Sequence, residues 1–168
     1  EDFYKKQCFA ELAPVLETLV YLRHEANVWL EITTLLIPGL NDSEKELDEL
    51  CGWMAQNLGT DVPLHFTAFH PDFKLVDIPA TPTSTLLRAR KQAQAAGLRH
   101  VYTGNVRVAV GQSTYCGSCG KRVIERDGYT IGRFDLADGG CKHCGTPLAG
   151  RFEAQAGAWG SRRMRLPI

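Results

Sequence analysis

The sequence contains no long hydrophobic run and carries no net charge. No apolar stretch approaches the roughly 20 residues that a membrane-spanning helix requires, and the first residues do not resemble a targeting segment. The 19 Lys and Arg are balanced by 19 Asp and Glu, and 44% of the 168 residues are hydrophobic. We therefore expect a cytoplasmic protein without a membrane partner, long enough for one buried core and a small additional module.

Common catalytic motifs are also missing. The sequence has no Ser-His-Asp or Cys-His grouping, no phosphate-binding loop and no paired-carboxylate motif. Residue patterns alone therefore do not name a reaction.

The strongest chemical signal is a pair of Cys-x-x-Cys-Gly turns, with 21 residues between the second cysteine of the first turn and the first cysteine of the second turn. The first contains Cys116 and Cys119, and the second contains Cys141 and Cys144. Four thiolates at this spacing suit a tetrahedral zinc ion, and the glycine after each second cysteine permits the positive φ of such a turn. The sequence predicts one zinc site.

Two disulfides, or iron bound as in rubredoxin, are the alternatives at this site. The sequence shows no signal peptide and no wider cysteine framework, which favours zinc over disulfides. His143 lies inside the second turn and could replace a cysteine, but with four thiols present we expect it not to bind the metal. Cys8 and Cys51 fall on apolar faces of predicted helices, where we expect core thiols.

The charge is unevenly divided along the chain. Residues 1–105 hold 9 Lys and Arg against 14 Asp and Glu, whereas residues 106–168 hold 10 against 5. In the second segment the basic residues alternate with acids and lack an aromatic platform, so we expect a solvated surface and not a nucleic-acid interface. We predict two domains with this boundary.

Hydrophobic periodicity predicts an α/β fold in residues 1–105. Apolar, β-branched strands are expected at 28–37, 63–70 and 99–103, and helices at 14–24, 43–58 and 83–96. Consecutive strands that are connected by helices form right-handed βα units of a parallel sheet. The first strand is so apolar that we expect both of its faces to be covered.

The second domain is predicted to be a zinc-ribbon-like β module. Residues 123–126 and 129–134 are expected to form a hairpin about Asp127 and Gly128, after a linker at 105–113. The arginines of the C-terminal tail are expected to be solvated; they are Arg162, Arg163 and Arg165.

Several polar residues interrupt the predicted strands or follow them. In parallel α/β proteins ligands bind beyond the carboxyl ends of the strands. A buried carboxylate such as Glu31 needs a partner or a ligand, because an unpaired one would be costly; structural hydrogen bonds are the alternative for the whole set. His65 is interpreted as a core or structural residue. The candidate binding residues are Glu31, Thr33, Thr67, His70, Thr103 and Asn105.

Three stretches, at 31–42, 65–71 and 102–105, resemble the C-terminal part of the radical S-adenosylmethionine enzymes of the AmmeMemoRadiSam system, relatives of pyruvate formate-lyase activating enzyme. The resemblance covers nearly the whole chain and includes residues 113–116 and 157–160. It implies a partial, TIM-like (β/α)6 barrel in which a [4Fe-4S] cluster and S-adenosylmethionine generate a 5′-deoxyadenosyl radical that abstracts hydrogen from a substrate, which could be a protein.

In such an enzyme the six candidate residues would line the S-adenosylmethionine cavity. The family binds its cluster through a Cys-x3-Cys-x2-Cys motif that this sequence lacks. We therefore expect the chain to be the last three βα units of the barrel plus the ribbon, inactive without the missing N-terminal half. The alternative is a zinc-ribbon binding module that docks a protein or nucleic acid. A catalytic metal at the ribbon is not expected, because four cysteines leave no open coordination position.

Overall fold

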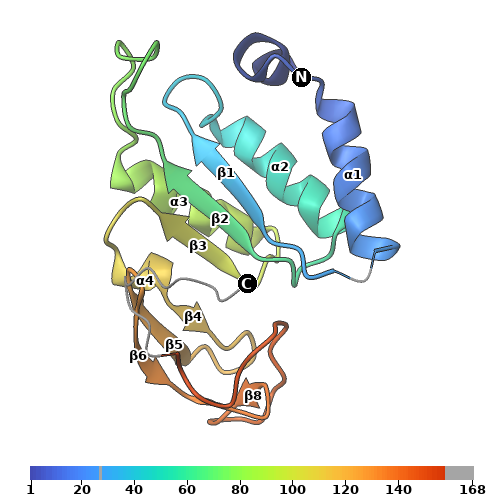
Figure 1. Ribbon diagram of the computed structural model, residues 1–168, viewed down its shortest axis with the longest axis vertical. Coiled ribbons are helices and arrows are strands. Elements are labelled where there is room, and N and C mark those ends of the chain that lie inside the picture. Colours follow the sequence, from blue (N-terminus) through green and yellow to red (C-terminus); the bar gives the residue numbers. More distant parts are fainter. Residues whose placement is uncertain (27, 158–168) are drawn as a thin grey trace, which may run out of the picture. The chain divides into compact units, whose positions relative to one another are not determined.

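A computed structural model describes residues 1–26 and 28–157 (Figure 1). The chain divides into a first unit, Glu1–Val106, and a second unit that begins at Arg107, one residue beyond the boundary expected from charge and pattern. No described helix is both long and apolar enough to cross a membrane. Residues 158–160 of the family resemblance and the three tail arginines lie outside the described residues.

The first unit is built on a three-stranded parallel sheet. The strands are β1 (Ile32–Leu36), β2 (Leu64–Ala68) and β3 (Val101–Gly104), in the order β1-β2-β3. Helix α2 (Glu44–Asn57) joins the first two strands and α3 (Thr83–Ala95) joins the last two (Figure 1). The predicted parallel α/β architecture is confirmed. The three strands are each shorter than predicted, at four or five residues.

Helix α2 begins and ends at residues that the sequence marks clearly. The Ser43 side chain caps the first turn by accepting a hydrogen bond from the Glu46 N–H at 3.3 Å. At the other end Gly59 adopts φ +87°, a left-handed conformation that allows the chain to leave the helix. Between these caps a stripe of side chains at helical spacing is buried; it consists of Leu47, Cys51 and Met54.

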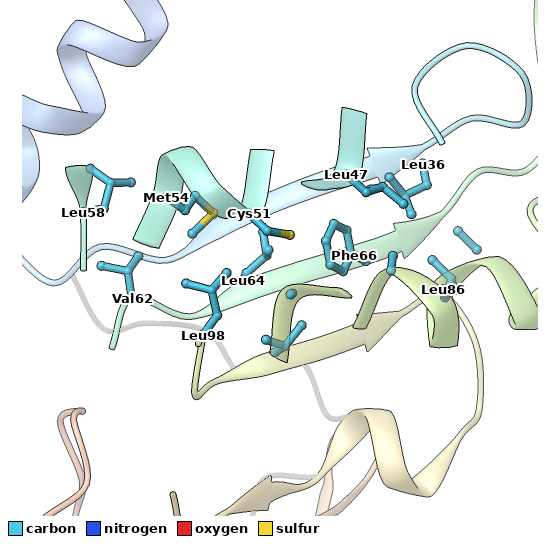
Figure 2. Packing of buried hydrophobic residues seen from close by; sticks show 14 residues of the cluster. Leu36, Leu47, Cys51, Met54, Leu58, Val62, Leu64, Phe66, Leu86 and Leu98 are labelled. Carbon is cyan, nitrogen blue, oxygen red and sulfur yellow. The ribbon is translucent and has the colours of Figure 1, made fainter. Parts of the chain in front are cut away.

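The core of the first unit lies between these two helices and one face of the sheet (Figure 2). Phe66 on β2 is among its largest side chains and is 0% exposed. Burying one such side chain contributes about 1.5–3 kcal/mol, so this layer is the principal source of stability for the unit. The other labelled members are Leu36, Leu47, Cys51, Met54, Leu58, Val62, Leu64, Leu86 and Leu98.

The opposite face of the sheet is exposed along β1 and half-buried along β2 and β3, which corrects the prediction that both faces of the first strand are covered. Leu35 on β1 is 41% exposed, and its neighbour Thr33 is also exposed. Alternate residues of a strand point to opposite faces, and the register aligns the second residue of each strand in one row and the fourth in another. We call this surface the open face; it consists of Thr33, Leu35, His65, Thr67, Tyr102 and Gly104.

Two helical segments precede the sheet. A π-helical turn, Tyr4–Cys8, is followed by α1 (Leu12–His24), which packs Leu19 and Val20 against the core. The sequence predicted Cys8 to be a core thiol, but it is exposed. The prediction was wrong because no residue of the π-helical turn is buried. Its apolar side chains do not pack into a core.

The second unit contains a three-stranded antiparallel sheet in the order β4-β5-β6. Strand β4 is Thr114–Tyr115, β5 is Arg122–Asp127 and β6 is Thr130–Phe134. The predicted hairpin is therefore present, with Gly128 and Tyr129 as its two-residue turn, shifted by one residue from the expected position. The sequence did not predict β4, because two residues are too few to show alternation.

Two further short elements complete the second unit. Helix α4 (Ala109–Gln112) occupies part of the predicted linker, and β7 (Leu136–Ala137) pairs with β8 (Gly140–Cys141) in an antiparallel ribbon. A small core of this unit surrounds two of the cysteines. Its buried members are Cys116, Val123, Ile124, Leu136 and Cys141.

Candidate functional site

The first cysteine turn follows β4 directly. Cys116 donates its backbone N–H to the Lys121 carbonyl at 2.9 Å, and the Gly120 N–H donates to the Cys116 carbonyl at 2.9 Å. Gly120 has φ +69°, as the sequence predicted, and no atom lies within 4 Å of the place a Cβ would occupy. Glycine is therefore required for its backbone conformation and not for space. The turn brings the Cys119 side chain back toward that of Cys116.

The second cysteine turn repeats the same hydrogen bonds after β8. Cys141 donates its backbone N–H to the Thr146 carbonyl at 2.9 Å, and the Gly145 N–H donates to the Cys141 carbonyl at 2.8 Å, with Gly145 at φ +75°. Two equal turns thus present Cys141 and Cys144 opposite the first pair. This repetition is the structural basis of the repeated sequence motif.

The four sulfur atoms form one compact cluster, all within 4.8 Å of one another. The Sγ atoms of Cys116 and Cys144 are 3.6 Å apart, and those of Cys119 and Cys141 are 3.8 Å apart. A tetrahedral zinc ion with Zn–S bonds of about 2.3 Å separates its sulfurs by about 3.8 Å. The four cysteines form a site that could hold a metal ion such as zinc.

Burial and protonation differ among the four thiols. Cys116 and Cys141 are buried in the small core, whereas Cys119 and Cys144 are exposed. Hydrogen bonds between the Cys144 sulfur and the side chain and backbone of Thr146 lower the pKa of the Cys144 thiol to about 6. A hydrogen bond from the Lys121 backbone favours the Cys119 thiolate, but lost solvation and the neighbouring thiols raise the pKa of Cys119 to about 11. A metal must therefore displace a proton at Cys119.

His143 is oriented by a carboxylate. Its Nε2 lies 3.2 Å from Asp135 Oδ2, while its backbone N–H donates to the Cys141 sulfur at 3.4 Å. The histidine side chain is not part of the four-sulfur cluster. The candidate ligands that the described residues bring together are four cysteines.

The candidate binding residues of the first unit are only partly brought together. Thr33 on β1 and Thr67 on β2 both lie on the open face. Thr33 is in the row of His65, and Thr67 is in the neighbouring row with Leu35. Glu31 precedes β1 and is exposed, so it lies near the amino end of the sheet and not in a buried strand as expected. Its carboxylate does have partners: it accepts hydrogen bonds from Trp29 Nε1 at 2.8 Å and from His65 Nε2 at 2.9 Å.

The other three candidates are placed differently. Thr103 is 4% exposed and lies on the helix-covered face, where its hydroxyl has no hydrogen-bond partner among the described residues. Asn105 follows β3 with φ +59° and donates to the Ala68 carbonyl at 3.1 Å, so its amide connects the ends of two strands. His70 is exposed beyond the end of β2. The structure does not bring Thr103 to the open face.

Sequence reasoning missed the residues that surround Glu31. His65, interpreted from the sequence as core or structural, is the second residue of β2, and its ring stacks on Tyr102 with centroids 5.0 Å apart. The alternation of β2 already placed His65 on the same face as Thr67. What the sequence could not supply was the register that makes Tyr102 its neighbour.

Comparison with known proteins finds a protein of similar sequence. No protein-family model matches the chain. The chain is 44% identical over 149 residues to the uncharacterized protein MJ0808 of Methanocaldococcus jannaschii, a match that covers 88% of this chain and 44% of the relative. The chain therefore spans less than half the length of that curated relative.

Proposed function

We propose that this chain is the C-terminal part of a radical S-adenosylmethionine enzyme, with the four-cysteine ribbon as a structural zinc module. The observation that carries the proposal is the arrangement of the first unit. Its three parallel strands have α2 and α3 packed on one face and a partly polar surface on the other. Consecutive βα units of this kind are the building blocks of a barrel, whose interior is the face without helices.

The proposal assigns the open face to the interior of that barrel. Thr33 and Thr67 would then contact S-adenosylmethionine, and Asn105 and His70, which follow the strands, would lie at the carboxyl-end rim where such barrels bind ligands. Thr103 has no such role, because it lies on the helix side of β3.

An iron–sulfur cluster does not fit the residues of this chain. Four of its six cysteines form the ribbon site, Cys51 is in the core and Cys8 is exposed. We assign the cluster ligands to a preceding segment of a longer protein. The length of the relative, more than twice that of the match, supports this assignment.

The activity is tested with the complete open reading frame that contains this chain. The purified protein is reconstituted with iron and sulfide without oxygen, reduced, and assayed for 5′-deoxyadenosine. We expect cleavage by the longer protein and none by the 168-residue chain. Thr67→Val should reduce cleavage, whereas the matched variant Thr103→Val, on the other face, should not. Cleavage by the 168-residue chain, or a longer protein without the three-cysteine motif, would refute the proposal.

The alternative function is a zinc-ribbon module that docks a protein or nucleic acid. The nucleic-acid version is weakened because several basic side chains of the second unit are engaged within it. Arg122 pairs with Glu125 at 2.8 Å, Arg133 lies 3.6 Å from Asp135, and Arg126 donates to the Thr114 hydroxyl at 2.6 Å. Filter binding of nucleic acid at increasing salt concentration tests this alternative against the radical enzyme. Binding through phosphates weakens steeply with salt.

A further inference from the structure

A cluster of four side chains surrounds the amino end of the open face. Glu31 is held at both oxygens: Oε1 accepts from Trp29 Nε1 at 2.8 Å, and Oε2 lies 2.9 Å from His65 Nε2. His65 stacks on Tyr102, with an angle of 26° between the ring planes. The cluster connects the segment before β1 with β2 and β3, so its geometry depends on the register of all three strands.

The contact with Glu31 determines the tautomer of His65. An ionised carboxylate only accepts hydrogen bonds, so Nε2 carries the ring proton. The neutral ring therefore holds its lone pair on Nδ1, which has no hydrogen-bond partner among the described residues. The Trp29 contact fixes the carboxylate and the Tyr102 contact fixes the plane of the ring, so the position of Nδ1 is well defined.

The pair is accessible and is not part of the core. The side chains of His65 and Glu31 are 31% and 47% exposed. Thr33, the register partner of His65 on β1, is exposed beside it. A pair with a purely structural role would add little to the free energy of unfolding, since solvent-exposed ion pairs contribute at most about 1 kcal/mol. The arrangement of a base held by a carboxylate is the one that positions histidines for proton transfer.

We infer that His65 is a proton-transfer residue for a ligand bound on the open face, with Glu31 as its positioning residue. The ligand class is a molecule that presents a hydroxyl or ammonium proton, because neutral Nδ1 is an acceptor. The inference uses contacts within the first unit only and does not depend on the proposed radical chemistry.

In the proton-transfer step the O–H or N–H bond of the ligand breaks, and its electron pair stays on the ligand. The proton passes to Nδ1, and the ring becomes an imidazolium whose charge faces the Glu31 carboxylate. The reverse step returns the proton, so no other reactant is consumed. Tyr102 stacks on the ring, and Trp29 donates a hydrogen bond to the carboxylate.

The first test measures the tautomer in the intact 168-residue chain. The protein is labelled with ¹⁵N-histidine, the His65 signals are identified by their loss in His65→Gln, and spectra are recorded at a pH where the ring is neutral. We expect the Nε2–H form in the wild type and a mixture of tautomers in Glu31→Gln, whose amide can donate as well as accept. A wild-type ring protonated on Nδ1 overturns the inference, whatever the stability of the variants.

The second test measures whether Nδ1 is reactive, using diethylpyrocarbonate as an electrophilic probe of unprotonated histidine nitrogen. Modification is mapped by mass spectrometry, with His100, which is 7% exposed, as an internal slow reference. We expect His65 to react faster than His100 and to slow about fivefold in Glu31→Gln. The matched control is Asp61→Asn, which removes a surface carboxylate paired with Arg99 and should leave the His65 rate unchanged.

Equal His65 reaction rates in the wild type and in Glu31→Gln, with both proteins folded, contradict the positioning role of Glu31. If Glu31→Gln unfolds, Trp29→Phe replaces it, because this variant frees one oxygen of the Glu31 carboxylate.

Discussion

Loss of one ribbon cysteine should unfold the second unit and leave the first unit folded. We choose Cys116→Ser, because Cys116 lies in the buried part of the cluster and its sulfur is 3.6 Å from that of Cys144. A structural zinc ion of this kind supplies about 10 kcal/mol or more to folding. Three aliphatic side chains are buried in the small core, namely Val123, Ile124 and Leu136. At roughly 2 kcal/mol each, they cannot replace the metal.

The assay is amide hydrogen exchange followed by mass spectrometry on the zinc-loaded chain. In Cys116→Ser we expect the amides of β5 and β6 to lose protection, while those of β2 and α2 keep it, because the two units have separate cores. Zinc content should fall from one ion per chain to near zero. Treatment of the wild type with a strong chelator should reproduce the variant.

The matched control is Cys8→Ser, which removes an exposed thiol outside the cluster. It should change neither the zinc content nor the protection of any segment. Ribbon amides that stay protected in metal-free Cys116→Ser would refute the reasoning, because the small core would then be sufficient to fold the unit.

Three further predictions follow from the same contacts. Phe66→Ala should destabilise the first unit by about 3–5 kcal/mol through a core cavity, whereas Leu35→Ala on the open face should cost about 1 kcal/mol or less; thermal or denaturant unfolding measures both. Gly145→Ala should cost about 1–2 kcal/mol, because it forces a side chain into a left-handed conformation at φ +75°, and should weaken zinc binding in a competition titration with a chromogenic chelator. Burial lowers the pKa of His100, so as the pH falls below about 6.5 the unfolded chain gains a proton that the folded chain does not, and stability should decrease; His100→Gln should weaken this dependence in unfolding measured from pH 8 to 5.

Local patterns were sufficient to predict most elements of this protein. The serine cap and the terminal glycine located α2, and the two Cys-x-x-Cys-Gly turns identified four residues that do converge. Both signals are short-range, since a cap or a tight turn is determined by residues within about five positions of one another. Such signals can therefore be recognised in the sequence without knowledge of the tertiary fold.

Predictions that depended on burial were less reliable. Composition indicated a first strand covered on both faces, yet Leu35 is 41% exposed. Cys8 was assigned to a core that it does not reach. An apolar residue in the sequence shows only that burial would be favourable; which surfaces are buried depends on which elements pack together.

By itself, the amino-acid sequence determined the parallel order of βα units, the helix caps and the four cysteines of the candidate metal site, because each depends on neighbours along the chain. Only the tertiary structure decided that His65 meets Glu31 and Tyr102, and that Thr103 faces the helices. His65 and Tyr102 lie on different strands and Glu31 directly precedes a third. A shift of one residue in register would move every side chain of a strand to the opposite face. The register is set by packing over the whole sheet, and no segment of the sequence contains that information alone.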